Sequence, residues 1–355
     1  IRFLPDTLVL MGRDRDDRGR VDYDYLTNPG AVSTWPDLYD EQGTMYAVYD
    51  FLEKQCGVTW INPTDAGTLY RRQATLTVRG EETRRRPAMA FRGGSAAAEG
   101  AQYQYGGGLW RRGTEGAAAY MAAAYPLLHA VYPDTRERDT LPLRAQNRLF
   151  QYRMKAGGDQ RQCNHSFYNY YERFFYKDHK NFEAPHPEYF AQGYEGDEPP
   201  QLCYGNPATV AQVVADARDY FDHGGYRKPM RGIGTRGFQW GRDYFALEPM
   251  DNSSFCRCAQ CAPQYEPGRG GHSAHSTYWF RFVNAVAREI GKSHPGKFIS
   301  TLAYGSHEGL PAGFAVEDNV AVHFCISGNR MGGSSRLLND QVARLEEWRA
   351  RQPRN

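Results

Sequence analysis

Three cysteines lie within one short stretch of the chain, at Cys256, Cys258 and Cys261. Thiolates at this spacing can surround a tetrahedral Zn²⁺ ion, with Cys203 or a nearby histidine as the fourth ligand. A disulfide from Cys203 to one of the three explains the same residues in an oxidising compartment. In either case the cluster should cross-link the loop that carries Asp251. We therefore expect it to have a structural role, and the choice between zinc and a disulfide stays open.

Two carboxylates, Glu248 and Asp251, stand where an expected strand, residues 244–249, opens into a loop. In barrels of alternating strands and helices, catalytic groups lie at the C-terminal ends of the strands. Carboxyl groups at such a position can donate or accept a proton during catalysis. These two residues are therefore our candidate catalytic pair. In the competing interpretation, Asp251 caps the following turn and Glu248 pairs with an arginine inside the barrel.

Further side chains near the ends of expected strands are candidates for binding a substrate: Arg92, His165, Trp240, Asn252, Tyr304 and His323. His165 and Tyr304 end their strands and can hydrogen-bond a ligand there. A purely structural histidine fits His165 nearly as well, and His323, in mid-strand, fits the barrel interior. Trp240 and Trp110 are loop aromatics that suit stacking on a sugar, although a tryptophan is more often buried.

The composition narrows the class of protein. The chain has 355 residues with 43 basic and 41 acidic side chains, and its arginine runs are too short to form a basic face for nucleic acid. Because no run approaches the roughly 18 apolar residues that a membrane span needs, we expect none. Aromatic residues make up 14% of the chain, which suits either sugar stacking or ordinary packing. Seven cysteines leave at least one thiol unpaired within the chain.

Hydrophobic spacing divides the chain into a small α/β domain, residues 1–87, and a larger domain, residues 88–355. In the first, residues 44–54 have helical spacing with Gly57 as a C-cap, and residues 7–11, 58–61 and 74–78 resemble strands. In the second, strands alternate with helices, as a (β/α)8 TIM barrel requires. The expected strands are 88–92, 162–167, 201–204, 244–249, 298–304 and 319–326. The expected helices are 207–221, 278–290, with Ser276 as its N-cap, and 337–351.

Six expected strands fall short of a closed eight-stranded barrel. We expect the chain to be a fragment whose barrel is truncated at its C-terminal end, since Pro353 would stop the last helix before a further strand. The alternative is that residues 95–152 contain strands that their pattern does not reveal. The chain starts at Ile1 without a signal-peptide pattern, so a leader does not set its location.

Several motifs resemble carbohydrate-active enzymes. Residues 43–53 (GTMYAVYDFLE) with 57–63 (GVTWINP) are similar to the small α/β domain that precedes the catalytic barrel in β-hexosaminidases and α-glucuronidases. Other segments resemble a large bacterial family first catalogued as a domain of unknown function, part of which is glycoside hydrolase family 163. These segments are HPEYF (186–190), QLCYGNP (201–207), CRCAQC (256–261) after Asp251, and FVNAVA (282–287). The resemblance runs from about residue 1 to residue 351.

The resemblance implies a secreted or periplasmic endo-β-N-acetylglucosaminidase that acts on complex N-glycans or glycoproteins. It also implies a retaining mechanism, assisted by the substrate's acetamido group, that requires no cofactor. In hexosaminidases of this type two adjacent acidic residues share the work. Glu248 and Asp251 are three positions apart, so their roles stay unassigned. One alternative is a hydrolase of another sugar, such as a uronic acid whose carboxylate binds Arg92, which matches a basic residue of the family. The other is a non-catalytic glycan-binding barrel.

Overall fold

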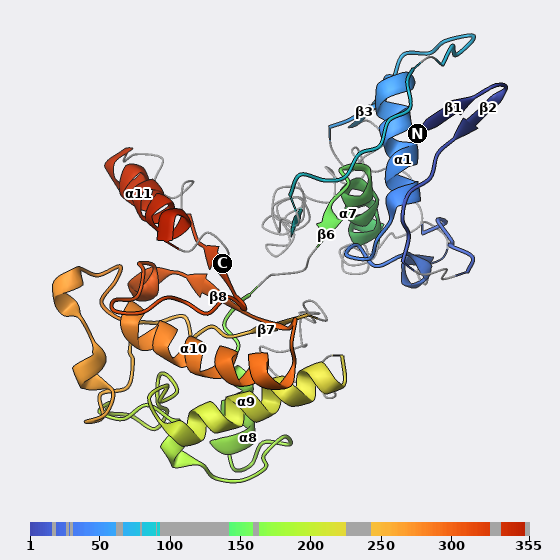
Figure 1. The fold of residues 1–355 in the computed structure, drawn as a ribbon. Helices are drawn as coiled ribbons and strands as arrows, with labels where there is room; N and C mark the ends of the chain where they lie inside the picture. Colours follow the sequence, from blue (N-terminus) through green and yellow to red (C-terminus); the bar gives the residue numbers. More distant parts are fainter. Residues whose placement is uncertain are drawn as a thin grey trace, which may run out of the picture. The chain divides into compact units, whose positions relative to one another are not determined.

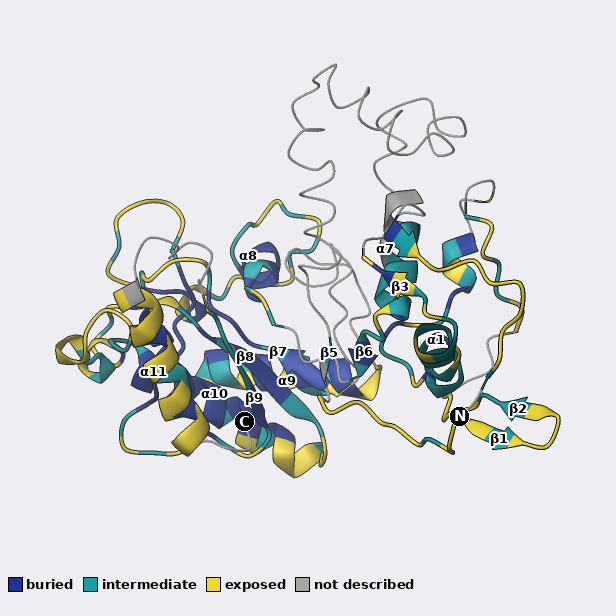
Figure 2. Cartoon of the chain, turned by 90° about the horizontal axis from the view of Figure 1, so that it is seen from above, coloured by how far each residue is buried: buried dark blue, intermediate teal, exposed yellow. Residues whose placement is uncertain are grey.

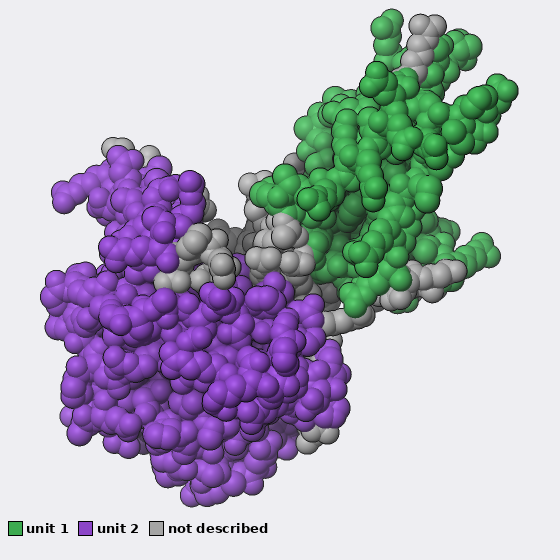
Figure 3. Space-filling view, in the orientation of Figure 1, with its two compact units in different colours: residues 1–160 green, residues 161–355 purple. Residues whose placement is uncertain are grey.

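The computed structural model describes residues 1–15, 19–25, 28, 31–61, 67–78, 80–89, 91–92, 142–158, 163–224, 243–326 and 335–351. The chain divides into two compact units, residues 1–160 and residues 161–355 (Figure 3). The domain boundary expected at residue 87 lies inside the first of these units.

Short strand pairs and helices make up the first unit. Its elements are β1 (Arg2–Leu4), β2 (Thr7–Val9), η1 (Ala31–Thr34), α1 (Gly43–Gln55), β3 (Thr59–Trp60), β4 (Thr68–Leu69), β5 (Phe91–Arg92), α7 (Pro142–Arg153) and β6 (Gly157–Gly158). The pairs β1–β2, β3–β4 and β5–β6 are antiparallel. The prediction of a strand at residues 74–78 is wrong: most of this segment is exposed, so no packed face favours a strand there.

Helix α1 confirms the helix predicted at residues 44–54. Its C-terminal end also follows the expected signal. Gly57 has a positive φ of 68°, and the Val58 amide donates to the Leu52 carbonyl oxygen over 3.1 Å. A left-handed glycine just past the C-cap residue is a common helix end.

Helix α7 supplies part of the core of the first unit. Ala145 and Tyr152 pack in one buried cluster with Trp35 and Leu38. The Tyr152 hydroxyl also donates to the Pro36 carbonyl oxygen over 2.5 Å. Residues far beyond position 87 therefore complete the core around the early part of the chain.

The second unit is built on a three-stranded parallel sheet (Figure 1). Its elements are α8 (Tyr168–Phe174), η4 (Pro187–Tyr189), α9 (Pro207–Asp222), β7 (Tyr244–Ala246), η5 (Ala262–Gln264), η6 (Pro267–Arg269), α10 (Ser276–Ser293), β8 (Phe298–Ala303), η7 (Gly305–His307), β9 (Val320–Phe324) and α11 (Ser335–Arg351). The sheet order is β7-β8-β9, with Tyr244 opposite Phe298 and Ile299 opposite Val320. Adjacent parallel strands joined through a helix are the repeating unit of α/β folds. A closed barrel stays a prediction.

Helices α9, α10 and α11 confirm the three helices that the hydrophobic spacing predicted in this part of the chain. In α10, Trp279, Val283 and Ile290 recur at the helical period and are 0% exposed. Figure 2 shows buried residues gathered on β7, β8, α9 and α10. The predicted cap of α10 is wrong by one position: Ser276 is the first helical residue, and His275 is the N-cap, without a capping side-chain hydrogen bond. Among the described helices, none is long and apolar enough to cross a membrane.

Two of the expected strands are not strands in the described part of the chain. Residues 201–204 form a single bridge, between Leu202 and Phe190. Residues 163–167 run beside the continuation of β7, where the Ser166 amide donates to the Glu248 carbonyl oxygen over 3.0 Å. In return, the Glu248 amide donates to the Ser166 hydroxyl over 2.9 Å. A side-chain oxygen thus takes the place of a main-chain partner, and a regular ladder does not form.

Candidate functional site

Three of the residues predicted from strand ends come together at the C-terminal edge of the parallel strands. The Tyr304 hydroxyl donates to Asp251 Oδ1 over 3.3 Å, and His165 Nε2 lies 3.5 Å from the same oxygen. The rings of His165 and Tyr304 meet edge to face, with 6.4 Å between their centroids. The Asp251 side chain is 62% exposed. We call this group, Asp251 with His165 and Tyr304, the carboxylate edge.

One hydrogen bond identifies Nδ1 of His165 as a donor. Its Nδ1 lies 2.5 Å from the Pro249 carbonyl oxygen. A carbonyl oxygen only accepts hydrogen bonds, so Nδ1 carries a proton. The contact between Nε2 and Asp251 is then attractive only if one further proton sits on Nε2 or on the carboxylate. The two side chains therefore lie within ion-pair distance of each other, with one ring nitrogen of His165 directed at the exposed carboxylate.

Glu248 has an environment of the opposite kind. The residue is 0% exposed, and its carboxylate accepts hydrogen bonds from three groups among the described residues. The donors are the Leu302 amide at 3.1 Å, the Thr301 hydroxyl at 3.4 Å and His307 Nε2 at 3.1 Å. Its partners are thus a histidine, a hydroxyl and a main-chain amide, in place of the arginine considered above. The enclosure favours a supporting role for Glu248 beneath the open carboxylate edge.

Gln201 holds the loop that carries Asp251, although the sequence did not single it out. Its Oε1 accepts from the Met250 amide over 3.0 Å, and its Nε2 donates to the Met250 carbonyl oxygen over 2.9 Å. The same Nε2 donates to Asn252 Oδ1 over 3.0 Å, and Asn252 Nδ2 donates to the Pro200 carbonyl oxygen over 3.1 Å. Asn252, predicted to bind substrate, is therefore one of the groups that fix the loop.

Two of the other predicted binding residues, Arg92 and His323, are among the described residues. Arg92 belongs to the first unit, where its guanidinium donates to the carbonyl oxygens of Lys155 and Met89. His323 is half-buried in β9, opposite Leu302 of β8. Trp240 and Trp110 lie outside the described residues.

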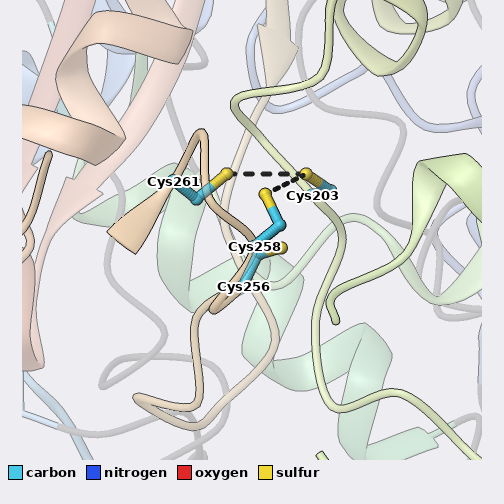
Figure 4. Close-up of side chains that lie close together, drawn as sticks. All are labelled: Cys203, Cys256, Cys258 and Cys261. Atoms are coloured by element: carbon cyan, nitrogen blue, oxygen red, sulfur yellow. Dashed lines mark hydrogen bonds between the residues drawn. The ribbon is translucent and has the colours of Figure 1, made fainter. Parts of the chain in front are cut away.

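The second candidate site is a cluster of four cysteines, Cys203, Cys256, Cys258 and Cys261, which we call the cysteine cluster. Their sulfur atoms all lie within 4.8 Å of one another. Cys203 Sγ is 3.5 Å from Cys261 Sγ and 4.0 Å from Cys258 Sγ. Figure 4 shows Cys203 facing the loop that carries the other three. Of the fourth ligands considered from the sequence, the structure thus brings Cys203 to the group.

Hydrogen-bond donors and a closely packed backbone segment surround these sulfur atoms. The Gln192 amide donates to Cys256 Sγ over 3.3 Å, and the Tyr278 hydroxyl donates to Cys261 Sγ over 3.2 Å. A hydrogen bond from Cys203 is the main cause that lowers the pKa of Cys256, and the same contact raises the pKa of Cys203. The backbone of Gly205 is so close that an added Cβ would lie 2.6 Å from Cys261 Sγ.

Comparison with known proteins adds a family. The model of a family described as a domain of unknown function (DUF4838) matches residues 132–351, which include the carboxylate edge and the cysteine cluster. The chain belongs to this family. Membership confirms the resemblance to a family of unknown function, and the link to glycoside hydrolases stays a prediction. No significant match was found among curated proteins or among solved structures.

Proposed function

We propose that the chain is a glycoside hydrolase that cleaves β-linked N-acetylhexosamine within glycans, with retention of configuration. The observation that carries the proposal is the carboxylate edge: an exposed Asp251 carboxylate contacts His165 and Tyr304 beyond the C-terminal ends of parallel strands. This is the face on which α/β barrels place their catalytic groups. A substrate of this kind, such as a complex N-glycan on a glycoprotein, goes with a secreted or periplasmic location.

In the proposed reaction Asp251 is the acid. Its proton passes to the glycosidic oxygen as the bond from that oxygen to the anomeric carbon breaks, and the acetamido oxygen of the substrate closes on the same carbon. In the second step a water attacks the anomeric carbon, the acetamido oxygen leaves, and Asp251 takes the proton of the water. His165 and Tyr304 orient the Asp251 carboxylate, and His165 shares its proton between steps.

The enclosure of Glu248 supports the acetamide-assisted form of this mechanism. Within the described part of the chain, the hydrogen bonds that its carboxylate accepts come from buried or main-chain groups, and the residue is 0% exposed. A carboxylate in this position cannot reach a sugar without breaking those bonds. When the acetamido group of the substrate is the nucleophile, the protein does not need to supply a second attacking carboxylate.

The test is release of oligosaccharide from a complex N-glycoprotein, measured by mass spectrometry. We expect the purified protein to leave one N-acetylglucosamine on the glycoprotein, and Asp251→Asn to reduce the rate by at least about 100-fold, as loss of a general acid does. Asp243→Asn is the matched control, because the Asp243 side chain is equally exposed, at 62%, and precedes the start of β7. Equal rates in the two variants would remove Asp251 from the mechanism.

The same enclosure of Glu248 favours one second candidate, a non-catalytic glycan-binding protein. With the glutamate fully engaged, Asp251 and Tyr304 remain as groups that can hydrogen-bond sugar hydroxyls without cleaving the chain. Retention of a complex glycan on the immobilised protein, with no oligosaccharide released, would support this candidate over the hydrolase.

A further inference from the structure

We infer that the cysteine cluster binds one structural zinc ion. The four residues come from two segments far apart in the sequence, with Cys203 in one and the CxCxxC loop in the other. Zinc with four cysteine ligands is a common structural centre, and such centres have all positions filled by protein. This inference stands independently of the proposed hydrolase activity.

The spacing of the sulfur atoms fits a tetrahedron around zinc. Zinc–sulfur bonds are about 2.3 Å long, so two sulfurs at the corners of a tetrahedron lie about 3.8 Å apart. The distances from Cys203 Sγ, 3.5 Å to Cys261 Sγ and 4.0 Å to Cys258 Sγ, lie on either side of this value. A sulfur–sulfur bond is about 2.05 Å long, and all seven cysteines of the chain are free.

The groups around the sulfurs suit bound thiolates. Binding of Zn²⁺ displaces protons from the thiols, and the resulting centre carries excess negative charge on sulfur. The Gln192 amide and the Tyr278 hydroxyl already point their hydrogens at Cys256 Sγ and Cys261 Sγ. Hydrogen bonds of this kind stabilise and orient metal ligands.

Burial makes the centre structural. Four protein ligands complete the tetrahedral coordination of the ion and leave no position for a substrate. Access is limited as well, because Cys203, Cys256 and Cys261 are buried and Cys258 is half-buried. The ion would join the segment after Gln201, which holds the Asp251 loop, to the loop that follows Asp251. It would therefore fix the carboxylate edge from outside the reaction.

Elemental analysis of protein purified without chelator tests the inference. We expect about one zinc per chain in the wild-type protein and in Cys56→Ser, whose thiol lies outside the cluster. Cys203→Ser and Cys258→Ser should each lose most of the metal. Cys258 is the more informative position because, of the four, it is the one that is not fully buried. Less than about 0.2 zinc per chain in the wild-type protein would overturn the inference, as would stoichiometric iron.

A second measurement does not depend on how well the variants fold. Wild-type protein loaded with Co²⁺ in place of zinc should show thiolate-to-cobalt charge-transfer bands and the strong visible bands of tetrahedral cobalt. Intact mass measured under non-reducing conditions detects a disulfide, which is the competing interpretation. A mass two hydrogens below that of the reduced chain, with no cobalt bands and with the disulfide located between cluster cysteines by peptide mapping, would reject the metal.

Discussion

The loop after β7 connects two regions whose reactive side chains differ in exposure to solvent. At the carboxylate edge, Asp251 is 62% exposed and contacts a histidine and a tyrosine that leave it open to solvent. On the inner side, Glu248 is 0% exposed and the cysteine cluster is mostly buried. Side chains of reactive type therefore occur in both regions, and exposure separates those that can meet a substrate from those that hold the loop.

This difference assigns separate roles to two carboxylates that the sequence treats alike. Glu248 accepts its hydrogen bonds from groups on or just after β8, so it joins the end of β7 to the neighbouring strand. Asp251 accepts a hydrogen bond from the Tyr304 hydroxyl, lies near His165, and is 62% exposed. Changes at Glu248 or in the cysteine cluster should reduce stability, and changes at the carboxylate edge should reduce function.

The largest expected effect on stability comes from Glu248→Gln. The new amide group would face the Leu302 N–H or His307, and a buried donor would lose its acceptor, at a cost of about 3 kcal/mol in the free energy of unfolding. Asp251→Asn should change that free energy by less than about 0.5 kcal/mol, because the side chain is exposed. Urea denaturation followed by circular dichroism measures both. Equal losses in the two variants would break the distinction between the closed and open regions.

A smaller loss is expected from Gly205→Ala on the closed side. The new Cβ would lie 2.6 Å from Cys261 Sγ, and the resulting overpacking should cost about 2 kcal/mol and lower the zinc content. Gly271→Ala is the control, since an added Cβ there meets no atom within 4 Å. Denaturation and elemental analysis of the two variants give the comparison. An unchanged zinc content in Gly205→Ala would show that the close approach is not needed for the metal.

The smallest of these effects is a dependence of stability on pH. Burial, aided by the charge of His307, lowers the pKa of His275 from 6.5 to about 4, and His275 Nδ1 has no hydrogen-bond partner among the described residues. The unfolded chain therefore takes up this proton at a higher pH than the folded chain, so stability is complete above about pH 6.5 and falls as the pH drops toward 4.

Urea denaturation at about pH 7 and about pH 5 tests this dependence. The shift in pKa alone corresponds to about 2 kcal/mol between these values, and solvent screening of the half-buried imidazole reduces the expected loss in the free energy of unfolding to about 1 kcal/mol. His275→Gln should lose correspondingly less. Identical losses in the two proteins would show that another group causes the fall.

Local patterns predicted the helices well because the information that forms a helix lies within it. Helix α9 begins where Asn206 caps the Ala208 amide and Pro207 occupies the first turn, and α10 buries one face at the helical period. Strands depend on a partner that the local sequence does not contain. Residues 74–78 have a strand-like pattern and no packed face, and the Ser166 hydroxyl takes a main-chain position beside β7.

In the candidate site, too, some residues could be predicted from the local sequence and others could not. Strand-end reasoning predicted Asp251, His165 and Tyr304, because the C-terminal ends of parallel strands meet at one edge. Gln201 and His307 were missed, since they contact segments 49 and 59 residues away in the sequence and neither belongs to a motif that marks such a contact. Cysteine spacing predicted the cluster, but it could not choose its fourth member. That choice depends on how the segment at Cys203 folds back.

Helix α10 also gives the protein an internal optical probe. Trp279 is 0% exposed, its indole N–H donates to the Thr301 hydroxyl over 3.0 Å, and its ring lies 5.6 Å from the ring of His307. The Thr301 hydroxyl and His307 are both partners of Glu248. The blue-shifted fluorescence of a buried indole, isolated as the difference between the wild-type protein and Trp279→Phe, therefore reports on the base of the carboxylate edge without an added dye.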